Sequence, residues 1–249
     1  MKYTTQLSLI TTLLLTTLSA EEQLQDITVT SATNSAQSLN DVTSDIDVIT
    51  EEELEEKHFT TVTEALNSLP GINFTSNGGI AATSSLYLRG FDNQKMLVVI
   101  DGVRYNDLTS SSGALPEHLM ISDIQQIEVL KGAQSGVWGA DAAAGVIVIT
   151  TKKAQQGLHL YATEEFGSFE TSKVDAGISY ANDTFYLKAD HSSVRSQSFT
   201  SQAPINEDLD QFEDDGYKND TTHLKAGLTI TPTNKIDLSH TIIDTKSDY

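Results

Sequence analysis

The chain has 249 residues, of which 35 are acidic and 15 are basic, so its formal net charge is −20. This excess of acid argues against nucleic acid as a partner, because phosphate binding needs clusters of Lys and Arg. The absence of cysteine excludes a disulfide scaffold, thiol catalysis and a cysteine-based zinc site. Apolar residues make up 38% of the chain, which is enough for a folded core.

Residues 1–20 have the pattern of a secretory signal peptide. Lys2 supplies the basic n-region, and residues 7–18, rich in Leu and Thr, form the apolar h-region. Ser19 and Ala20 are the small residues expected before the cleavage site. An N-terminal amphipathic helix is the alternative. The signal-peptide interpretation places the mature chain outside the cytoplasm, where residues 21–40 form an N-terminal segment.

Residues 41–155 predict a compact α+β domain. A helix is expected over residues 51–69, with Thr50 as its N-cap and Glu53 completing a capping box. Pro70 and Gly71 end it. Short strands are expected at residues 85–89, 96–100, 126–130 and 145–151.

Two of these strands, MLVVI and GVIVITT, are apolar throughout, which is typical of strands covered on both faces. Asp101 and Gly102 form a hairpin-turn signal directly after the first of them.

Residues 156–249 alternate strictly between apolar and polar side chains, as in Val174, Ala176 and Ile178. The runs span about ten residues, the length of a tilted strand in an outer membrane. Short turns at 181–183 and 232–234 contrast with a long polar segment at 194–220. About five strands of a transmembrane β-barrel fit this pattern, although a soluble β-sandwich alternates in the same way.

Four motifs in residues 65–153 carry a resemblance to a known family. They are ALNSLPGIN, LYLRGF, MLVVIDGVRYN and IEVLKGAQSGVWGADAAAGVIVITTKK, in that order along the chain. The segment resembles the plug domain of a TonB-dependent outer-membrane receptor. The resemblance implies an α+β plug domain followed by the antiparallel strands of a truncated transmembrane β-barrel, since the intact family barrel has about 22 strands.

The same resemblance implies a monomer in the cell outer membrane, in contact with outer-membrane lipid. It also implies a partner in the periplasm, the TonB protein, which adds a strand to an exposed N-terminal box. The box is matched by Asp26, Ile27, Thr28, Val29 and Thr30, whose β-branched residues suit an extended conformation. The alternative interpretation is an ordinary N-terminal strand of the plug.

Basic residues of the plug face carboxylates of the barrel in this family. Arg89 and Lys131 match these positions, and their expected partners lie beyond Tyr249. A lysine at the second position loses the bidentate pairing that an arginine makes.

Two loops at the plug apex are expected to contact a large nutrient ligand. Both are rich in small residues, which let the main chain approach a large neutral molecule closely. The candidate contacts are Asn77, Gly78, Gly79, Ser84, Ser85, Asn106, Ser111, Ser112 and Gly113.

This composition favours cobalamin, with ferric siderophores as the alternative. A secreted, Ca²⁺-stabilised β-rich adhesion module is a second alternative. The sequence shows no nucleophile elbow and no metal-hydrolase motif, so it does not indicate an enzyme.

Residues 205–220 contain seven acidic residues and one lysine. Such charge density suits Ca²⁺, which takes six to eight oxygen ligands from flexible loops. A solvated loop is the alternative. The resemblance to the cobalamin-receptor subgroup implies a Ca²⁺ site here, and its candidate ligands are Asp208, Asp210, Glu213, Asp215, Asp244 and Asp248.

Overall fold

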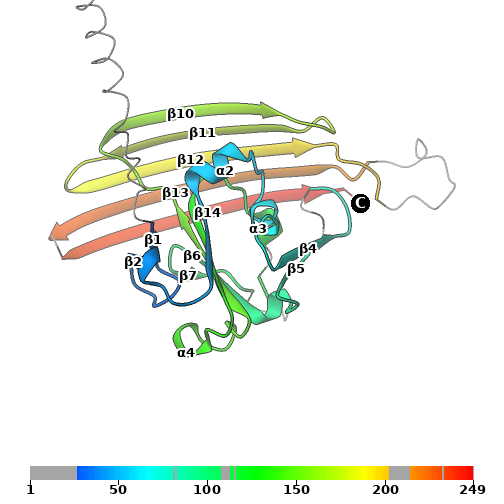
Figure 1. Ribbon diagram of the computed structural model, residues 1–249. Helices are drawn as coiled ribbons and strands as arrows, with labels where there is room; N and C mark the ends of the chain where they lie inside the picture. The colour runs from blue at the N-terminus through cyan, green and yellow to red at the C-terminus, as the bar shows by residue number, and fades with distance from the viewer. Residues whose placement is uncertain are drawn as a thin grey trace, which may run out of the picture.

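The computed structural model describes residues 27–80, 82, 84–107, 113–114, 116–201, 214–231 and 233–248. Figure 1 shows two parts, a small mixed unit formed by the N-terminal half and a large sheet that follows it. We call them the N-terminal unit (residues 27–153) and the wall sheet (residues 157–247). Within the described residues, none of the helices is long and apolar enough to cross a membrane.

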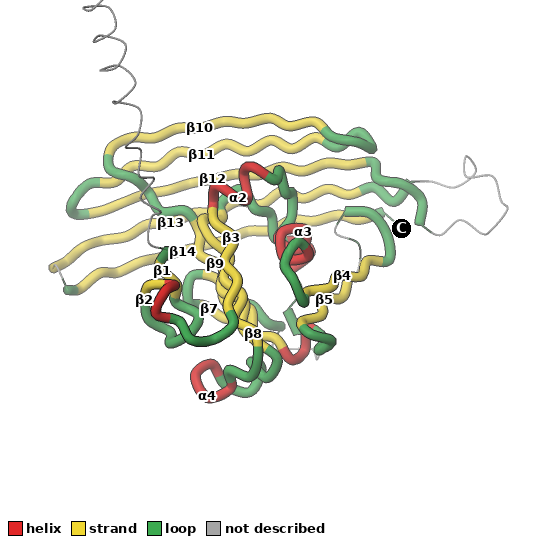
Figure 2. The backbone as a smooth tube through the Cα atoms, viewed as in Figure 1, coloured by secondary structure: helices red, strands yellow, loops and turns green. Residues whose placement is uncertain are grey.

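The N-terminal unit contains short helices and strands around one mixed sheet (Figure 2). Its elements are β1 (Thr28–Val29), β2 (Gln37–Ser38), η2 (Leu39–Asp41), β3 (Ile46–Thr50), α2 (Glu51–Glu56), α3 (Val62–Asn67), β4 (Ile72–Ser76), β5 (Ser84–Leu88), η3 (Asn93–Lys95), β6 (Met96–Ile100), β7 (Val103–Arg104), η4 (Pro116–His118), β8 (Ile124–Lys131), α4 (Ser135–Trp138) and β9 (Gly145–Thr151).

The central sheet has the strand order β3-β8-β9-β6-β7, in which only β6 and β9 run parallel to each other. One face packs on α2 and α3 through the main core, which includes Leu54, Leu66 and Ile147. The opposite face carries a second cluster that contains Val99 and Val146. The two apolar strands are therefore covered on both faces, as their sequences predicted.

The predicted turn after β6 is confirmed. Asp101 and Gly102 both have positive φ angles, 48° and 82°, and they join β6 to β7 in an antiparallel hairpin. The strand predicted at residues 85–89 ends one residue earlier, because Arg89 has a φ of 51° and leaves the extended conformation. Strands β3 and β4 were not predicted.

The single helix predicted over residues 51–69 is wrong. The chain forms α2 and α3 instead, separated by a break in which His58 has a φ of 50°. Thr50 is an N-cap as predicted, but Glu53 completes no capping box there. The complete capping box is at Thr61 and Glu64, so the second helix has its own start signal within the segment.

The wall sheet consists of five antiparallel strands, each paired with its neighbours in chain order. They are β10 (Gly157–Phe166), β11 (Ser172–Ala181), β12 (Phe185–Ser196), β13 (Tyr217–Thr231) and β14 (Asn234–Ser247). Alternate side chains face the N-terminal unit or point away from it. Lys173 and Asp175 on β11 are buried on the inner face, whereas Val174 and Ile178 are exposed on the outer face.

The long polar segment predicted at residues 194–220 is shorter in the structure. Strand β12 continues to Ser196 and β13 begins at Tyr217, with Val194 opposite Asn219. Asn219 also donates a hydrogen bond of 3.1 Å to the carbonyl oxygen of His118 in the N-terminal unit. Polar residues therefore continue the strand here, because the inner face of the sheet is itself a polar contact surface.

Candidate functional site

The segment predicted as the TonB box lies against the N-terminal unit. Asp26 is outside the described residues, and the other four residues are within them. Thr28 and Val29 form β1 and pair with β2, and the Val29 side chain is fully buried. The box is thus a short strand held by its own unit.

Glu128 on β8 holds the main chain that follows β1. Its Oε2 atom accepts hydrogen bonds from the N–H groups of Thr30 and Ser31, both at 2.8 Å. Gln126 on the same strand donates to the Thr28 carbonyl at 3.0 Å, and the Trp138 indole donates to the Ser31 carbonyl at 2.7 Å. The main-chain groups that strand addition would use are therefore partly occupied.

Glu128 is an acidic residue that the sequence reasoning did not single out. Its side chain is 1% exposed although it lies on a central strand within an apolar run. Buried carboxylates need hydrogen-bond partners, and the box supplies them here. A lone acid inside the motif IEVL was the available signal.

The first predicted apex loop lies on the wall sheet. A methyl group at Gly79 would overlap the Ser198 hydroxyl, and one at Gly78 would be 3.2 Å from Ser201 Oγ. Ser201 in turn donates its main-chain N–H to Asp215 at 2.9 Å. The two glycines therefore contact one end of the connection between β12 and β13, and Asp215 binds Ser201 at that end.

The second predicted apex loop has a structural side chain where a ligand contact was expected. The Asn106 side chain is buried, accepts from Val98 N–H and donates to the Met96 carbonyl, both at 2.8 Å. The Asn106 amide is therefore used inside the plug, and its predicted contact with a ligand stays a prediction. Gly113 packs on the Asn93 carbonyl, while Ser111 and Ser112 lie outside the described residues.

Ser84 and Ser85 lie on β5, opposite Ser76 and Thr75 of β4. Both are half-buried, so this part of the apex is a two-stranded hairpin and not an irregular loop.

Arg89 and Lys131 have carboxylate partners inside the N-terminal unit. Arg89 pairs with Asp45, and both side chains are about half exposed. Lys131 is buried, pairs with Asp47 and donates to the Pro70 carbonyl at 2.7 Å. Their pairing with carboxylates beyond Tyr249 stays a prediction.

Two ion pairs connect the N-terminal unit to the wall sheet. In both, the acidic residue is on the N-terminal unit and the basic residue is on the wall sheet, which is the reverse of the predicted pairs. Asp123, just before β8, pairs with Lys188 on β12, and Asp101 pairs with Lys225 on β13 at 2.9 Å. The sequence reasoning missed both. The available signal was a lysine at an inward position of an alternating strand.

Burial decides the pKa at one of these carboxyls and hydrogen bonding at the other. Burial raises the pKa of Asp123, and the nearby Lys188 opposes the shift. Burial would also raise the pKa of Asp101, but hydrogen bonds from Thr151 and from Lys225 outweigh it and hold that pKa below its usual range.

The described candidates for Ca²⁺ binding do not all lie together. Asp244 lies on the outer face of the wall sheet, directly opposite Asp220 in the strand register. Asp248 pairs with Lys246 at 2.8 Å, and its N–H donates to the carbonyl of Gly216, the residue next to Asp215. Asp208, Asp210 and Glu213 lie outside the described residues. Among the residues that are described, no group of three or more His, Asp or Glu side chains could hold a metal ion.

Comparisons with known proteins decide the family. Residues 38–146 match the model of the TonB-dependent receptor plug domain. The chain carries the plug of a TonB-dependent receptor. The N-terminal unit is therefore the plug, and the family is one of outer-membrane receptors and transporters, not of enzymes.

Among curated proteins, the receptor chain is similar to two vitamin B12 transporters, both named BtuB, from Vibrio vulnificus strains. One is 34% identical over 177 residues, which cover 70% of this chain and 25% of the relative. The other is 36% identical over 132 residues, or 53% of this chain and 22% of the relative. The chain thus spans about a quarter of the length of the curated relatives it matches.

Solved structures agree on the fold. The ferripyoverdine receptor of the Pseudomonas aeruginosa outer membrane superposes with a TM-score of 0.72 at 16% identity, covering 88% of this chain and 27% of that one. The siderophore receptor PirA of Acinetobacter baumannii gives 0.63 at 20% identity, covering 82% and 32%. At these identities the match supports the arrangement of plug and wall sheet alone.

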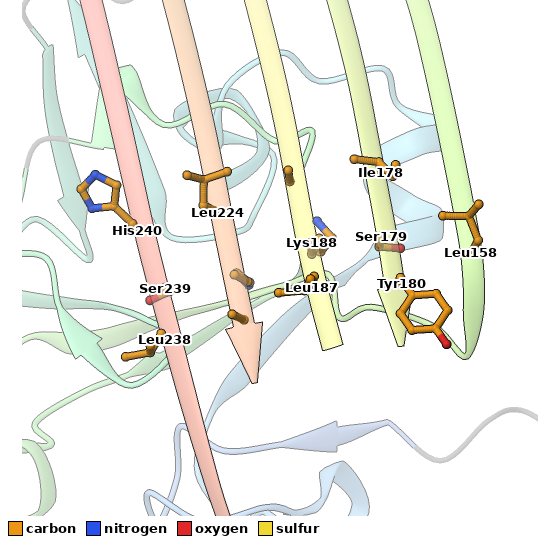
Figure 3. Close-up of a pocket in the computed structure, with 13 residues that line it drawn as sticks. Leu158, Ile178, Ser179, Tyr180, Leu187, Lys188, Leu224, Leu238, Ser239 and His240 are labelled. Carbon is orange, nitrogen blue, oxygen red and sulfur yellow. The ribbon is translucent and has the colours of Figure 1, made fainter. Parts of the chain in front are cut away.

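The receptor fold also explains an apolar groove on the wall sheet. Figure 3 shows Leu158, Ile178, Leu187, Leu224 and Leu238 on five neighbouring strands. These side chains are between 43% and 68% exposed, and all lie on the face away from the plug. An outward apolar band of this kind faces lipid in outer-membrane barrels, so the groove is not a nutrient site.

Proposed function

We propose that the chain is the plug and first wall strands of a receptor that imports cobalamin across the outer membrane, coupled to TonB. The similarity to vitamin B12 transporters over 70% of the chain carries this proposal. The sequence of the two apex segments, 77–85 and 106–115, supports it, because both are rich in small residues and contain none of the aromatic or arginine side chains expected at a ferric-siderophore site.

The box geometry supports a coupling step through TonB. Strand addition needs free main-chain N–H and carbonyl groups on the box. Because β2, Gln126 and Glu128 occupy part of these groups, TonB binding requires that the segment leave the plug surface. Force applied to the freed segment would then reach the plug through the main chain that follows Ser31.

Ca²⁺ is proposed as a structural ion of the same receptor. Asp215 and Asp248 both lie beside Gly216, where the connection between β12 and β13 meets the end of β14. An ion there would hold two neighbouring loops together, which is a common role for Ca²⁺ between flexible acidic segments. Asp244 is not part of this proposal because it lies on the outer face.

The test is equilibrium binding of cyanocobalamin to the full-length receptor in detergent, with Ca²⁺ and with a chelator. We expect saturable binding that weakens on chelation. Binding that does not respond to the chelator would keep cobalamin and remove the ion.

Absence of binding in both conditions would remove cobalamin. Ferric siderophores are the second candidate, because the receptors that share the fold include several siderophore receptors. Iron-loaded siderophores should then bind the same preparation, and they should not compete with cobalamin if the first candidate holds.

A further inference from the structure

Two lysines lie side by side on the inner face of the wall sheet. Lys188 on β12 and Lys225 on β13 are directly opposite each other in the strand register. Like charges at opposite positions of neighbouring strands repel. Each lysine meets one aspartate of the plug, Lys188 at Asp123 and Lys225 at Asp101. The two plug aspartates therefore offset the repulsion between these two lysines of the wall sheet.

The contact between Asp123 and Lys188 is closed to water. The Asp123 side chain is 1% exposed and that of Lys188 is 6% exposed. One oxygen of Asp123 bonds to Lys188, and its other oxygen is buried with no hydrogen-bond partner in the described part of the chain. A carboxylate placed in this way depends on its one cation, because an uncompensated buried charge is very unfavourable.

Lys188 has a second partner on its own strand. Asp190, two residues further along β12, also pairs with Lys188 and is 5% exposed. Asp190 additionally accepts a hydrogen bond of 2.8 Å from the Tyr161 hydroxyl on β10. If Asp123 left, the wall sheet would keep the pair of Lys188 and Asp190, and Asp123 would be hydrated.

The contact between Asp101 and Lys225 can also separate without leaving the plug carboxylate unpaired. Asp101 keeps two hydrogen bonds from Thr151 of the plug, from the N–H at 2.9 Å and from the hydroxyl at 2.5 Å. Separation of the plug from the wall sheet therefore leaves Asp101 with partners on its own side.

We propose that the pair of Asp123 and Lys188 is a releasable attachment that holds the plug closed against the wall sheet, and that Lys188 returns to Asp190 alone when the plug moves. The proposed role of this pair does not depend on which nutrient the receptor binds. It is independent of the cobalamin proposal, and its test needs no nutrient.

The test measures leakage through the full-length receptor in the outer membrane of living cells. The probe is vancomycin, a glycopeptide antibiotic too large to cross an intact outer membrane readily. Asp123→Asn removes the plug's charge and leaves the wall sheet with its own balanced pair. We expect vancomycin entry to rise by at least about tenfold, because loss of one partner of a buried ion pair strongly favours separation.

A charge exchange makes the test specific. In the double variant Asp123→Lys with Lys188→Asp, one lysine again faces two carboxylates, and entry should return close to the wild-type level. Asp141→Asn is the matched control, because it removes an aspartate from the exposed ion pair with Arg104 inside the plug. It should leave entry unchanged. Heat-modifiable mobility on gels checks that every variant reaches the membrane folded.

The proposal would be overturned if vancomycin entered cells with Asp123→Asn no faster than cells with the wild-type receptor. It would also be overturned if Asp141→Asn leaked as much as Asp123→Asn. Failure of the exchange to reduce leakage would also count against it. Lys188→Met gives a second measurement, since it leaves two buried carboxylates facing each other. It should leak more than Asp123→Asn, and the opposite order would contradict the proposed role of Asp190.

Discussion

Glu128 holds two consecutive main-chain N–H groups with one oxygen atom, and this contact fixes the segment that follows β1 on the plug. Its other oxygen accepts from Gln126 at 3.1 Å, so both oxygens of the carboxylate are used as acceptors. An amide has a single acceptor oxygen, and its NH₂ group would meet donors on one side. The charge also strengthens each bond, as is usual for carboxylates.

We expect Glu128→Gln to loosen the box in the full-length receptor. Loss of one or two charge-assisted hydrogen bonds corresponds to about 1.5–3 kcal/mol, which would speed amide exchange at Thr30 and Ser31 by roughly 10- to 100-fold. Hydrogen exchange read by mass spectrometry measures this. Glu56→Gln, at an exposed position at the end of α2, is the control and should leave the box unchanged. Unaltered exchange in Glu128→Gln would show that β2 and Trp138 hold the segment without it.

The segment predicted as one helix is divided into α2 and α3 because a second helix-start signal, the capping box of Thr61 and Glu64, lies inside it. Thr61 accepts from the N–H of Glu64, and Glu64 accepts from the N–H groups of Thr60 and Thr61. Thr61 is also 2% exposed and forms a bridge with Met120, which ties the start of α3 to the segment before β8. By contrast, the cap of α2 has one bond of 3.4 Å and no reciprocal bond.

Thr61→Ala should therefore destabilise its helix more than Thr50→Ala does. Loss of an N-cap costs about 1 kcal/mol, and roughly fivefold faster amide exchange in α3 is expected at that value. The comparison of Glu64–Leu66 amides in one variant with Glu53–Glu55 amides in the other gives the measurement. An equal effect in both helices would mean that the reciprocal bond of Glu64 contributes little.

The receptor as a whole separates two environments on the two faces of one sheet. Leu238 and Ser239 are neighbours on β14, and they point to opposite faces. Leu238 is 68% exposed on the outer face, where the bilayer is expected, while Ser239 faces the space between plug and wall sheet. A charge should be costly at the first position and tolerated at the second.

Leu238→Lys is expected to reduce insertion of the full-length receptor into phosphatidylcholine vesicles, at a cost of up to about 2–4 kcal/mol. Ser239→Lys is the matched control with the same new charge one residue away. The folded fraction, read from heat-modifiable gel mobility, should fall only for Leu238→Lys. Equal losses in both variants would contradict the assignment of the two faces.

Features that depend on neighbours along the chain could be predicted from the amino-acid sequence. Alternation with period two specified the wall strands and their faces, because successive side chains of a strand point to opposite sides. Asp101 and Gly102 specified a hairpin turn, because both tolerate positive φ angles. Four ordered motifs specified the plug family.

Contacts between distant segments, in contrast, became visible in the folded chain. Glu128 reaches Thr30 across 98 residues of chain, and Lys188 reaches Asp123 across 65. A local sequence pattern predicts the face of the strand or helix on which a residue lies, but not the residue that it contacts. The partner depends on how the plug docks on the wall sheet, and that docking is a sum of many contacts between distant segments. The family resemblance assigns barrel carboxylates to Arg89 and Lys131, whereas the pairs that join plug and wall sheet in the structure are formed by plug aspartates and wall lysines.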